Sequence, residues 1–409
     1  MNRSSSTKNI LAVTSSFPRW KGDGNIGGGD FVLTLSTGLN TDFNVHVLAP
    51  YCLEQKGKEE VDAVKTYRHK QFFIKKIELA FGSGMTANLA KNKLLFFVVP
   101  FYFMYQFFAI AKIVRKQKID IIHAYWLIPQ GLIAVLYKLL LNPKIKIAVS
   151  VLGSDFWSFN NRIGTGIKKF IFRNIDGLSV VSEAIEQEVR KMGYTKNICV
   201  CPMGIDTNAF SPERKSAALK EKYNATAEVL LFSGYCVEGK GIRYLIQAMP
   251  AIVKQFPQVQ LWLTGEGNLK EEMIALCKTL NIQNNVLFLG FVDRELLPVL
   301  HATSDIFVLP TLSEGFPIVV MEALSSGATT VVSDLPVFTQ LKGKDDFMFI
   351  TEKKNTQQIG DTIIRLLKNK EKLAEAKSKA RAFAVARFDW EHVISEHKKF
   401  LNEILNQQA

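Results

Sequence analysis

A loop and the start of a helix are predicted in the stretch Ser313-Glu314-Gly315-Phe316-Pro317-Ile318-Val319-Val320-Met321-Glu322-Ala323. A short apolar run, residues 305–310, precedes it and has the length and composition of a buried parallel strand. Gly315 suits a tight turn, and Pro317 suits the first position of a helix. The stretch therefore predicts a strand, then a loop that carries Glu314, then a helix with Glu322 roughly a turn and a half inside it.

Two carboxylates that flank a helix N-terminus suit a ligand with both hydroxyls and phosphates. Carboxylates accept hydrogen bonds from hydroxyls, and the free N–H groups and dipole of the helix favour an anion. The alternative is that Glu314 is a surface loop residue and Glu322 an exposed helix position, because glutamates mostly lie in water. The two glutamates alone do not decide between these interpretations.

Apolar runs of strand length alternate with helical stretches on both sides of the chain's midpoint. This alternation predicts an α/β fold with two doubly wound parallel sheets. Ligands bind such sheets at the carboxyl ends of the strands, so the cleft between the halves is the predicted site. The predicted strands are residues 10–14, 45–49, 119–123, 145–151, 175–181, 229–234, 260–264, 286–289, 305–309 and 329–333.

The chain of 409 residues is too long for one ordinary core, so two domains are expected. The predicted domains are residues 1–205 and residues 206–385, and the second begins with a polar linker, residues 206–228. Residues 386–409 are predicted to form a C-terminal helix.

The net charge of +13 lies entirely in the first half of the chain. Residues 1–205 hold 27 basic and 14 acidic residues, and the remainder holds 24 of each. A one-sided basic surface indicates an anionic partner, and we favour a membrane surface. Nucleic acid is disfavoured, because the basic residues belong to no recognisable module with aromatic platforms. Five scattered cysteines without zinc spacing and a polar start without a secretory signal predict a cytoplasmic location, peripheral on the inner face of the cell membrane.

Residues 94–111 form an uncharged apolar run, followed by Lys112, Arg115, Lys116 and Lys118. The run reaches the lower edge of transmembrane length. Pro100 interrupts it, and residues 119–123 must return as a strand of the same sheet, so a membrane span is disfavoured. Two interpretations remain open: a buried or half-buried core helix, and a helix that lies in the membrane interface.

The stretch around Glu314 and Glu322 resembles the E-x7-E signature of the retaining family 4 glycosyltransferases (glycosyl transferases group 1), which have the GT-B fold. The resemblance covers nearly the whole chain and implies that the first domain binds the acceptor and the second the nucleotide-sugar donor. It also implies that the C-terminal helix crosses back to the first domain. It also implies that Glu314 meets hydroxyls of a donor sugar, that Glu322 meets the ribose of the nucleotide, and that the helix N-terminus stabilises the leaving phosphates together with Lys240. This N-terminus comprises Gly315, Phe316, Pro317 and Ile318.

The segment Gly234-Tyr235-Cys236-Val237-Glu238-Gly239-Lys240-Gly241 resembles the family's phosphate-binding loop. Lys240 matches the family pattern, whereas Tyr235 stands where the family has an arginine. Tyrosine gives one hydrogen bond without charge, so Tyr235 is the main departure from the pattern. Arg243, just outside the motif, is the candidate to compensate. Gly265 resembles a family glycine near the sheet edge, and Gly290 and Phe291 are expected to place backbone against the base.

The first half carries the motifs expected on the acceptor side. Gly28 and Gly29 end a glycine-rich loop that resembles the family's N-terminal loop. His123 is predicted at a strand end and Asp155 in a loop, and the resemblance implies that both shape the acceptor site. A histidine at a strand end is otherwise usually a structural hydrogen bonder.

The resemblance implies a retaining hexosyltransferase that uses a UDP- or GDP-sugar donor, with no cofactor and no metal. It implies a glycolipid or polysaccharide-precursor acceptor. Two alternatives stay open: a degenerate GT-B nucleotide-binding subunit without transfer activity, and a sugar-nucleotide epimerase of the same fold.

Overall fold

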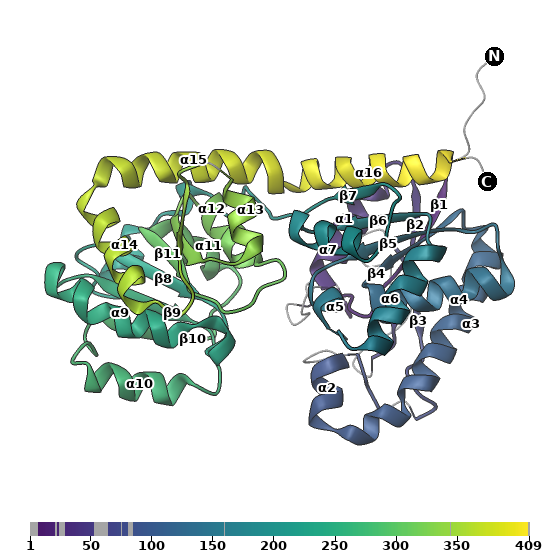
Figure 1. Ribbon diagram of the computed structural model, residues 1–409, viewed down its shortest axis with the longest axis horizontal. Helices are drawn as coiled ribbons and strands as arrows, with labels where there is room; N and C mark the ends of the chain where they lie inside the picture. The colour runs from purple at the N-terminus through teal and green to yellow at the C-terminus, as the bar shows by residue number, and fades with distance from the viewer. Residues whose placement is uncertain are drawn as a thin grey trace, which may run out of the picture. The chain divides into compact units, whose positions relative to one another are not determined.

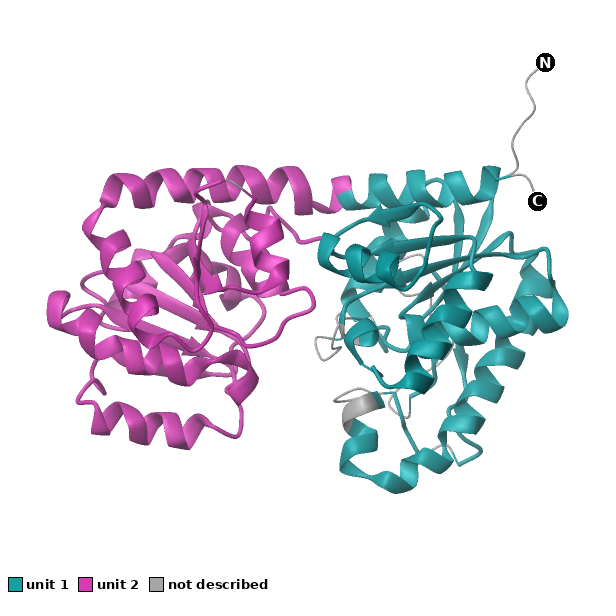
Figure 2. Ribbon diagram, viewed as in Figure 1, with its two compact units in different colours: residues 1–202, 393–409 teal, residues 203–392 magenta. Residues whose placement is uncertain are grey.

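The computed structural model describes residues 7–20, 23, 29–52, 64–74, 76–80, 85–158, 160–343 and 345–407. The chain divides into two compact units (Figure 2). The first comprises Met1–Pro202 and Val393–Ala409, and the second comprises Met203–His392. The division thus falls near residue 202, against residue 205 in the sequence analysis. The acceptor and donor roles of the two units stay predictions.

The first unit contains a parallel sheet with the strand order β3-β2-β1-β4-β5-β6-β7 (Figure 1). Every pairing in it is parallel, as the alternating pattern predicts. The strands are β1 (Asn9–Val13), β2 (Asn44–Pro50), β3 (Lys65–His69), β4 (Ile121–Tyr125), β5 (Lys146–Val151), β6 (Gly177–Val180) and β7 (Ile198–Val200).

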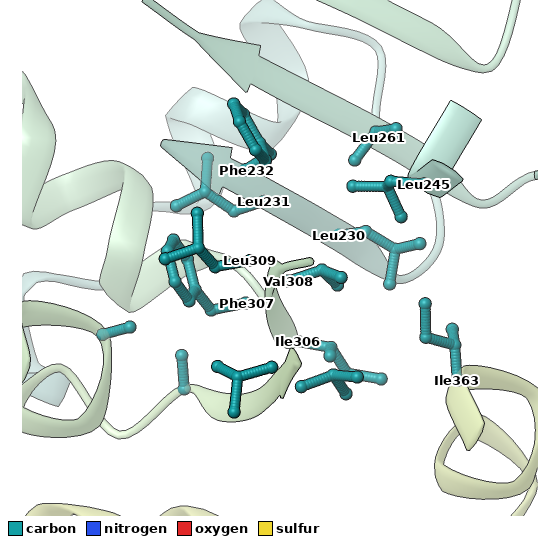
Figure 3. Close-up of a cluster of buried hydrophobic side chains, with 14 of the residues drawn as sticks. Leu230, Leu231, Phe232, Leu245, Leu261, Ile306, Phe307, Val308, Leu309 and Ile363 are labelled. Carbon is teal, nitrogen blue, oxygen red and sulfur yellow. The ribbon is translucent and has the colours of Figure 1, made fainter. Parts of the chain in front are cut away.

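The second unit contains a parallel sheet with the strand order β10-β9-β8-β11-β12-β13. Its strands are β8 (Val229–Ser233), β9 (Gln260–Thr264), β10 (Val286–Gly290), β11 (Ile306–Leu309), β12 (Thr329–Ser333) and β13 (Met348–Thr351). The central strands β8 and β11 are buried at every residue, which explains their uninterrupted apolar sequences. Figure 3 shows part of this core, where Leu231 and Phe232 of β8 lie near Phe307 and Leu309 of β11.

Helices connect the strands in both units (Figure 1). In the first unit they are α1 (Gly29–Leu39), α2 (Met85–Lys91), the 3-10 helix η1 (Lys93–Phe97), α3 (Val99–Gln117), η2 (Leu127–Gly131), α4 (Leu132–Leu141), α5 (Ser154–Trp157), α6 (Arg162–Asn174) and α7 (Glu183–Lys191). In the second unit they are η3 (Pro212–Arg214), α8 (Ala217–Lys222), η4 (Glu238–Lys240), α9 (Ile242–Gln255), α10 (Lys270–Thr279), α11 (Leu296–Thr303), α12 (Ile318–Ser325), α13 (Pro336–Lys342), α14 (Thr356–Lys368) and α15 (Lys370–Phe388).

The last helix, α16 (Trp390–Asn406), belongs to the first unit from Val393 onward. Glycines let it approach the rest of that unit closely. A Cβ atom on Gly38 of α1 would lie 2.2 Å from Ile394 Cδ1, and one on Gly177 of β6 would lie 2.3 Å from Ile404 Cδ1. Side chains larger than hydrogen at these two positions would therefore displace the helix.

The apolar run of residues 94–111 is divided between η1 and α3, and the break is at Val98. Pro100 lies in the first turn of α3, where its missing N–H costs nothing, so it begins this helix rather than interrupting it. The segment Lys93–Gln117 has the length and hydropathy of a membrane span, and 28% of its most apolar window is buried, which is low for a core helix. One face of α3 is buried and the other is exposed.

Candidate functional site

Two loops at the carboxyl end of the second sheet are fastened to each other. Gly241 has φ 68°, and a Cβ atom there would lie 1.9 Å from the carbonyl oxygen of Pro310, so only glycine fits. The N–H of Leu312 donates to the carbonyl oxygen of Gly239 at 2.8 Å. The loop after β8 is thus fixed against the loop after β11, which brings two distant sequence motifs together.

The contact between these loops places Lys240 on Glu314. The Lys240 ammonium donates to Oε1 of the Glu314 carboxylate, and the two side chains are 26% and 11% exposed. Thr311 is fully buried, and its hydroxyl lies 2.9 Å from the carbonyl oxygen of Gly239 and 3.3 Å from Glu314 Oε1. The result is a partly buried ammonium and carboxylate, both held on loops at strand ends.

Helix α12 begins directly after this loop. Gly315 and Phe316 precede it, Pro317 is its N-cap and Ile318 its first residue. The Phe316 ring packs edge-on against Phe388, with ring centroids 6.2 Å apart. The predicted strand, loop and helix are therefore present, with β11 before the stretch and α12 within it. Pro317 is the N-cap and not the first helical residue, so the helix begins four residues after Glu314.

Glu322 lies in the second turn of α12. Although the residue is only half-buried, desolvation raises the pKa of its carboxyl to about 7, and the positive charge of Arg294 acts in the opposite direction. A carboxyl with this pKa exists in both protonation states near neutral pH. It can donate a hydrogen bond or accept one from a hydroxyl group.

Gly265 and Gly290 join the neighbouring strand ends to the same edge. The N–H of Gly265 donates to the carbonyl oxygen of Gly290 at 2.7 Å. Gly265 has φ 108°, and a Cβ atom on it would lie 2.1 Å from the carbonyl oxygen of Gly234. Phe291 follows Gly290 and is 82% exposed. The segments that follow β8, β9, β10 and β11 thus contact one another through their backbones and form one surface.

Tyr235 stands on this surface and is 71% exposed. Arg243 does not share its place. The guanidinium of Arg243 lies 2.7 Å from Glu272 and 3.8 Å from Glu238, so two carboxylates already engage the candidate compensating charge.

In the first unit His123 is not at a strand end, as the sequence suggested, but in the middle of β4. The strand runs on to Tyr125, which pairs with Ser150 of β5. The ring of His123 is fully buried, with Nε2 at 2.7 Å from Ser150 Oγ and its centroid 6.1 Å from that of His397 on α16. Burial lowers its pKa. Its contacts are those of a core residue, and its role toward an acceptor stays a prediction.

Asp155 was predicted in a loop but lies in the first turn of the short helix α5, where its side chain joins the segments after β4 and β5. Its carboxylate accepts hydrogen bonds from the N–H groups of Leu127 at 2.7 Å, Leu152 at 3.1 Å and Gly153 at 3.0 Å. Desolvation raises its pKa, and these N–H groups oppose the rise. Gly29 is the first residue of α1 and is buried. Gly28 lies outside the described residues.

The structure therefore joins Lys240 and Glu314 directly, and joins Gly265 to Gly290 through the backbone, all within the second unit. Two neighbours of the site were missed from sequence: Thr311 beside Glu314, and Arg294, whose charge acts on Glu322. Thr311 lies three residues before Glu314, a position that the loop prediction left unexamined. Within the described residues no three His, Cys, Asp or Glu side chains group closely enough to hold a metal ion.

Two family models match this chain. The model of glycosyltransferase family 4 matches residues 27–209, and the model of glycosyl transferases group 1 matches residues 214–383. N-acetyl-alpha-D-glucosaminyl L-malate synthase of Bacillus anthracis is 27% identical over 72% of this chain and 77% of its own length. A phosphatidyl-myo-inositol mannosyltransferase of Mycobacterium leprae is 29% identical over 48% of this chain and 50% of its own length.

Solved structures match over almost the whole chain. A sucrose-phosphate synthase from Thermosynechococcus elongatus has a TM-score of 0.76 at 18% identity, covering 97% of this chain and 99% of its own. An Anabaena protein in complex with UDP and glucose has a TM-score of 0.69 at 18% identity, covering 97% of this chain and 100% of its own. At this identity the match concerns the fold, and it confirms the predicted pair of Rossmann-like domains.

Proposed function

We propose that this chain, which belongs to the family 4 glycosyltransferases of GT-B fold, moves a hexose from a UDP- or GDP-sugar to a glycolipid or polysaccharide-precursor acceptor with retained anomeric configuration. One observation carries the proposal: Lys240 and Glu314, 74 residues apart in sequence, meet at the strand ends of the second unit. An ammonium serves a phosphate and a carboxylate serves sugar hydroxyls, so this pair suits both parts of a nucleotide sugar.

In the proposed reaction an acceptor hydroxyl oxygen bonds to the anomeric carbon while the bond from that carbon to the diphosphate oxygen breaks. The electron pair stays on the diphosphate, and the acceptor's proton passes to a departing phosphate oxygen. Lys240 and the α12 N-terminus, Gly315 to Ile318, stabilise the charge that develops there. The proposal of a metal-free reaction rests on the family resemblance.

The remaining predicted residues receive positioning roles in this proposal. Glu314 holds sugar hydroxyls, Glu322 holds the ribose, and Gly265, Gly290 and Phe291 lie against the nucleotide. Before the donor binds, Glu314 neutralises Lys240. The donor must therefore compete with the Glu314 carboxylate for the Lys240 ammonium. On binding, the phosphate oxygens of the donor take the place of the carboxylate oxygen beside Lys240.

The acceptor is proposed to lie at the cytoplasmic face of a membrane. The relative that acts on phosphatidyl-myo-inositol, by its name, supports a lipid-linked acceptor. The basic first half of the chain and the exposed face of α3 support a membrane contact of that unit. His123 and Asp155 are proposed to support the acceptor side by fixing β4, β5 and the loops after them.

A degenerate nucleotide-binding subunit is the second candidate, and Tyr235 favours it. The exposed tyrosine stands where the family has an arginine, and Arg243 is engaged by Glu272 and Glu238. On this reading the chain binds a nucleotide without transferring a sugar.

Slow hydrolysis of the donor distinguishes the two candidates without knowledge of the acceptor. The purified protein is incubated with UDP-glucose, UDP-N-acetylglucosamine or GDP-mannose, and the released sugar is followed by proton NMR. We expect one donor to release its sugar first with the anomeric configuration of the donor, and Lys240→Ala to abolish the release. Release of the opposite anomer would contradict retention, and nucleotide binding without any release would favour the degenerate subunit.

A further inference from the structure

Helix α3 of the first unit exposes an apolar face along its first part. Its exposed residues follow helical spacing and are apolar for three turns: Phe97, just before the helix, then Phe101, Met104 and Phe108. We call these four residues the apolar stripe. The opposite face is buried and includes the polar residues Tyr102 and Gln106 beside apolar ones. The helix is therefore apolar on its exposed face as well, whereas a surface helix in water normally exposes polar residues.

Two polar residues on the otherwise apolar buried face of α3 have polar partners. Gln106 Nε2 lies 3.2 Å from His69 Nε2, and the hydroxyl of Tyr102 lies 3.5 Å from Gln130 Nε2. These contacts fix the rotation of the helix about its axis, so the stripe cannot turn inward. Its exposure is built into the fold.

The apolar surface extends beyond the stripe itself. Phe73 packs on Phe101 with ring centroids 5.7 Å apart, and is itself 58% exposed. Phe107 of α3 packs on Tyr137 of α4, with centroids 6.1 Å apart. The last residues of α4, Leu139 to Leu141, are also exposed. Two adjacent helices therefore present apolar side chains to solvent.

Charge identifies the partner of this surface. The spacing of the stripe continues into Lys112 and Arg115, both exposed, with Lys116 beside them. Lys91 and Lys93 precede it and are exposed as well. The sequence holds no acidic residue between Glu78 and Asp120, but six basic ones. Apolar side chains bordered at both ends by cations match the acyl region and the anionic headgroups of a bilayer.

A second copy of this chain fits less well. In a twofold dimer through the stripe, the cations at its two ends would face other cations whether the helices ran parallel or antiparallel. A span is disfavoured for a different reason: the buried face of α3 packs within the first unit, and the chain enters β4 directly after it.

We propose that the apolar stripe of α3 lies in the interface of an anionic lipid bilayer, parallel to its plane, with Lys112, Arg115 and Lys116 on the headgroups. This inference rests on the proposed membrane location of the acceptor and names the surface that makes the contact. Its test reads lipid binding alone, so that failure of the surface and failure of the transferase proposal give different results.

The test is flotation of the full chain with vesicles of phosphatidylglycerol and, separately, of phosphatidylcholine. We expect the wild type to bind phosphatidylglycerol more tightly. Phe97→Ser with Phe108→Ser should lower binding by about tenfold or more per phenylalanine, and the loss should persist in high salt. Lys112→Gln with Arg115→Gln and Lys116→Gln should lower binding to phosphatidylglycerol alone.

Matched controls separate the stripe from general hydrophobicity and charge. Ile163→Ser changes an exposed apolar residue of α6, and Lys254→Gln with Lys278→Gln removes two exposed cations of the second unit. Both should bind like the wild type, and circular dichroism should show all variants folded. The proposal is overturned if the wild type binds neither vesicle, if the phenylalanine variants bind unchanged, or if light scattering shows a dimer that those variants dissociate and vesicles do not.

Discussion

Replacing Lys240 with alanine should weaken nucleotide binding strongly and slow sugar release even more. A charge-assisted hydrogen bond to a phosphate contributes about 1.5–3 kcal/mol, which corresponds to roughly 10- to 150-fold in affinity. If the ammonium also stabilises the leaving diphosphate in the transition state, the rate constant should fall by about 10²–10³. The variant should therefore lose activity at saturating donor as well as at low donor.

The same substitution should destabilise the second unit only moderately. Lys240 and Glu314 are 26% and 11% exposed, between a surface pair, worth about 0–1 kcal/mol, and a buried pair, worth about 3–5 kcal/mol when broken. We expect a loss of about 1–2 kcal/mol in the free energy of unfolding. Glu314→Ala should cost a similar amount, and the double variant less than the sum of the two.

Isothermal calorimetry with UDP and GDP, donor hydrolysis and urea unfolding measure these three effects. Lys379→Ala is the matched control, because Lys379 pairs with Glu375 at 2.7 Å on α15 and both side chains are exposed. It should change neither affinity nor turnover. If Lys240→Ala remains folded and keeps both nucleotide affinity and turnover within about twofold of the wild type, the reasoning about this pair is wrong.

Four further substitutions test the roles of Tyr235, Glu322 and His397. Tyr235→Arg should raise the affinity for UDP or GDP about tenfold in calorimetry, because a guanidinium can make a bidentate contact with a phosphate, while Tyr235→Phe should change the affinity little. An unchanged affinity in Tyr235→Arg would place the phosphates elsewhere. Glu322→Gln should stabilise the protein in urea by about 1–3 kcal/mol above about pH 7 and much less near pH 4.5, because a carboxyl whose pKa is raised to about 7 gives up its stabilising proton as the pH rises through that value. Equal effects at both pH values would contradict the raised pKa of this carboxyl. Acidification from pH 6.5 toward pH 4 should destabilise the first unit, because burial lowers the pKa of His69 and His397 to about 4 and the unfolded chain takes up protons first. His397→Phe should reduce this pH dependence of the unfolding free energy by up to about 3 kcal/mol. An unaltered pH dependence would contradict the lowered pKa of His397.

The central strands could be predicted because both of their faces are buried. β8 and β11 read as unbroken apolar runs for that reason, and the pattern located them within one residue. β3 escaped prediction because its sequence, Lys-Thr-Tyr-Arg-His, is that of a polar edge strand, which among the described residues pairs only with β2. β13, an edge strand of the second sheet, was also missed.

The site was predicted as residues but not as contacts. Sequence placed Lys240 and Glu314 in one site only through the family resemblance, whereas their meeting depends on Gly241 fitting against Pro310. His123 was misplaced because the apolar pattern cannot show where a buried strand ends, and β4 continues through Ala124 and Tyr125. The sequence left open whether residues 94–111 form a core helix or an interfacial one, because an apolar run does not show which of its faces the rest of the fold covers.

Thermal unfolding of the purified protein with and without UDP, GDP and ADP tests the claim that the second unit holds a nucleotide-sugar donor. A nucleotide at about 100 times its dissociation constant adds about 2.7 kcal/mol of stability, which corresponds to roughly 5–10 °C for a unit of this size. We predict such a shift with UDP or with GDP. In Lys240→Ala the same nucleotide concentration should give about half of this shift or less, because the affinity falls roughly 10-fold or more. No shift with any of the three nucleotides would contradict the claim.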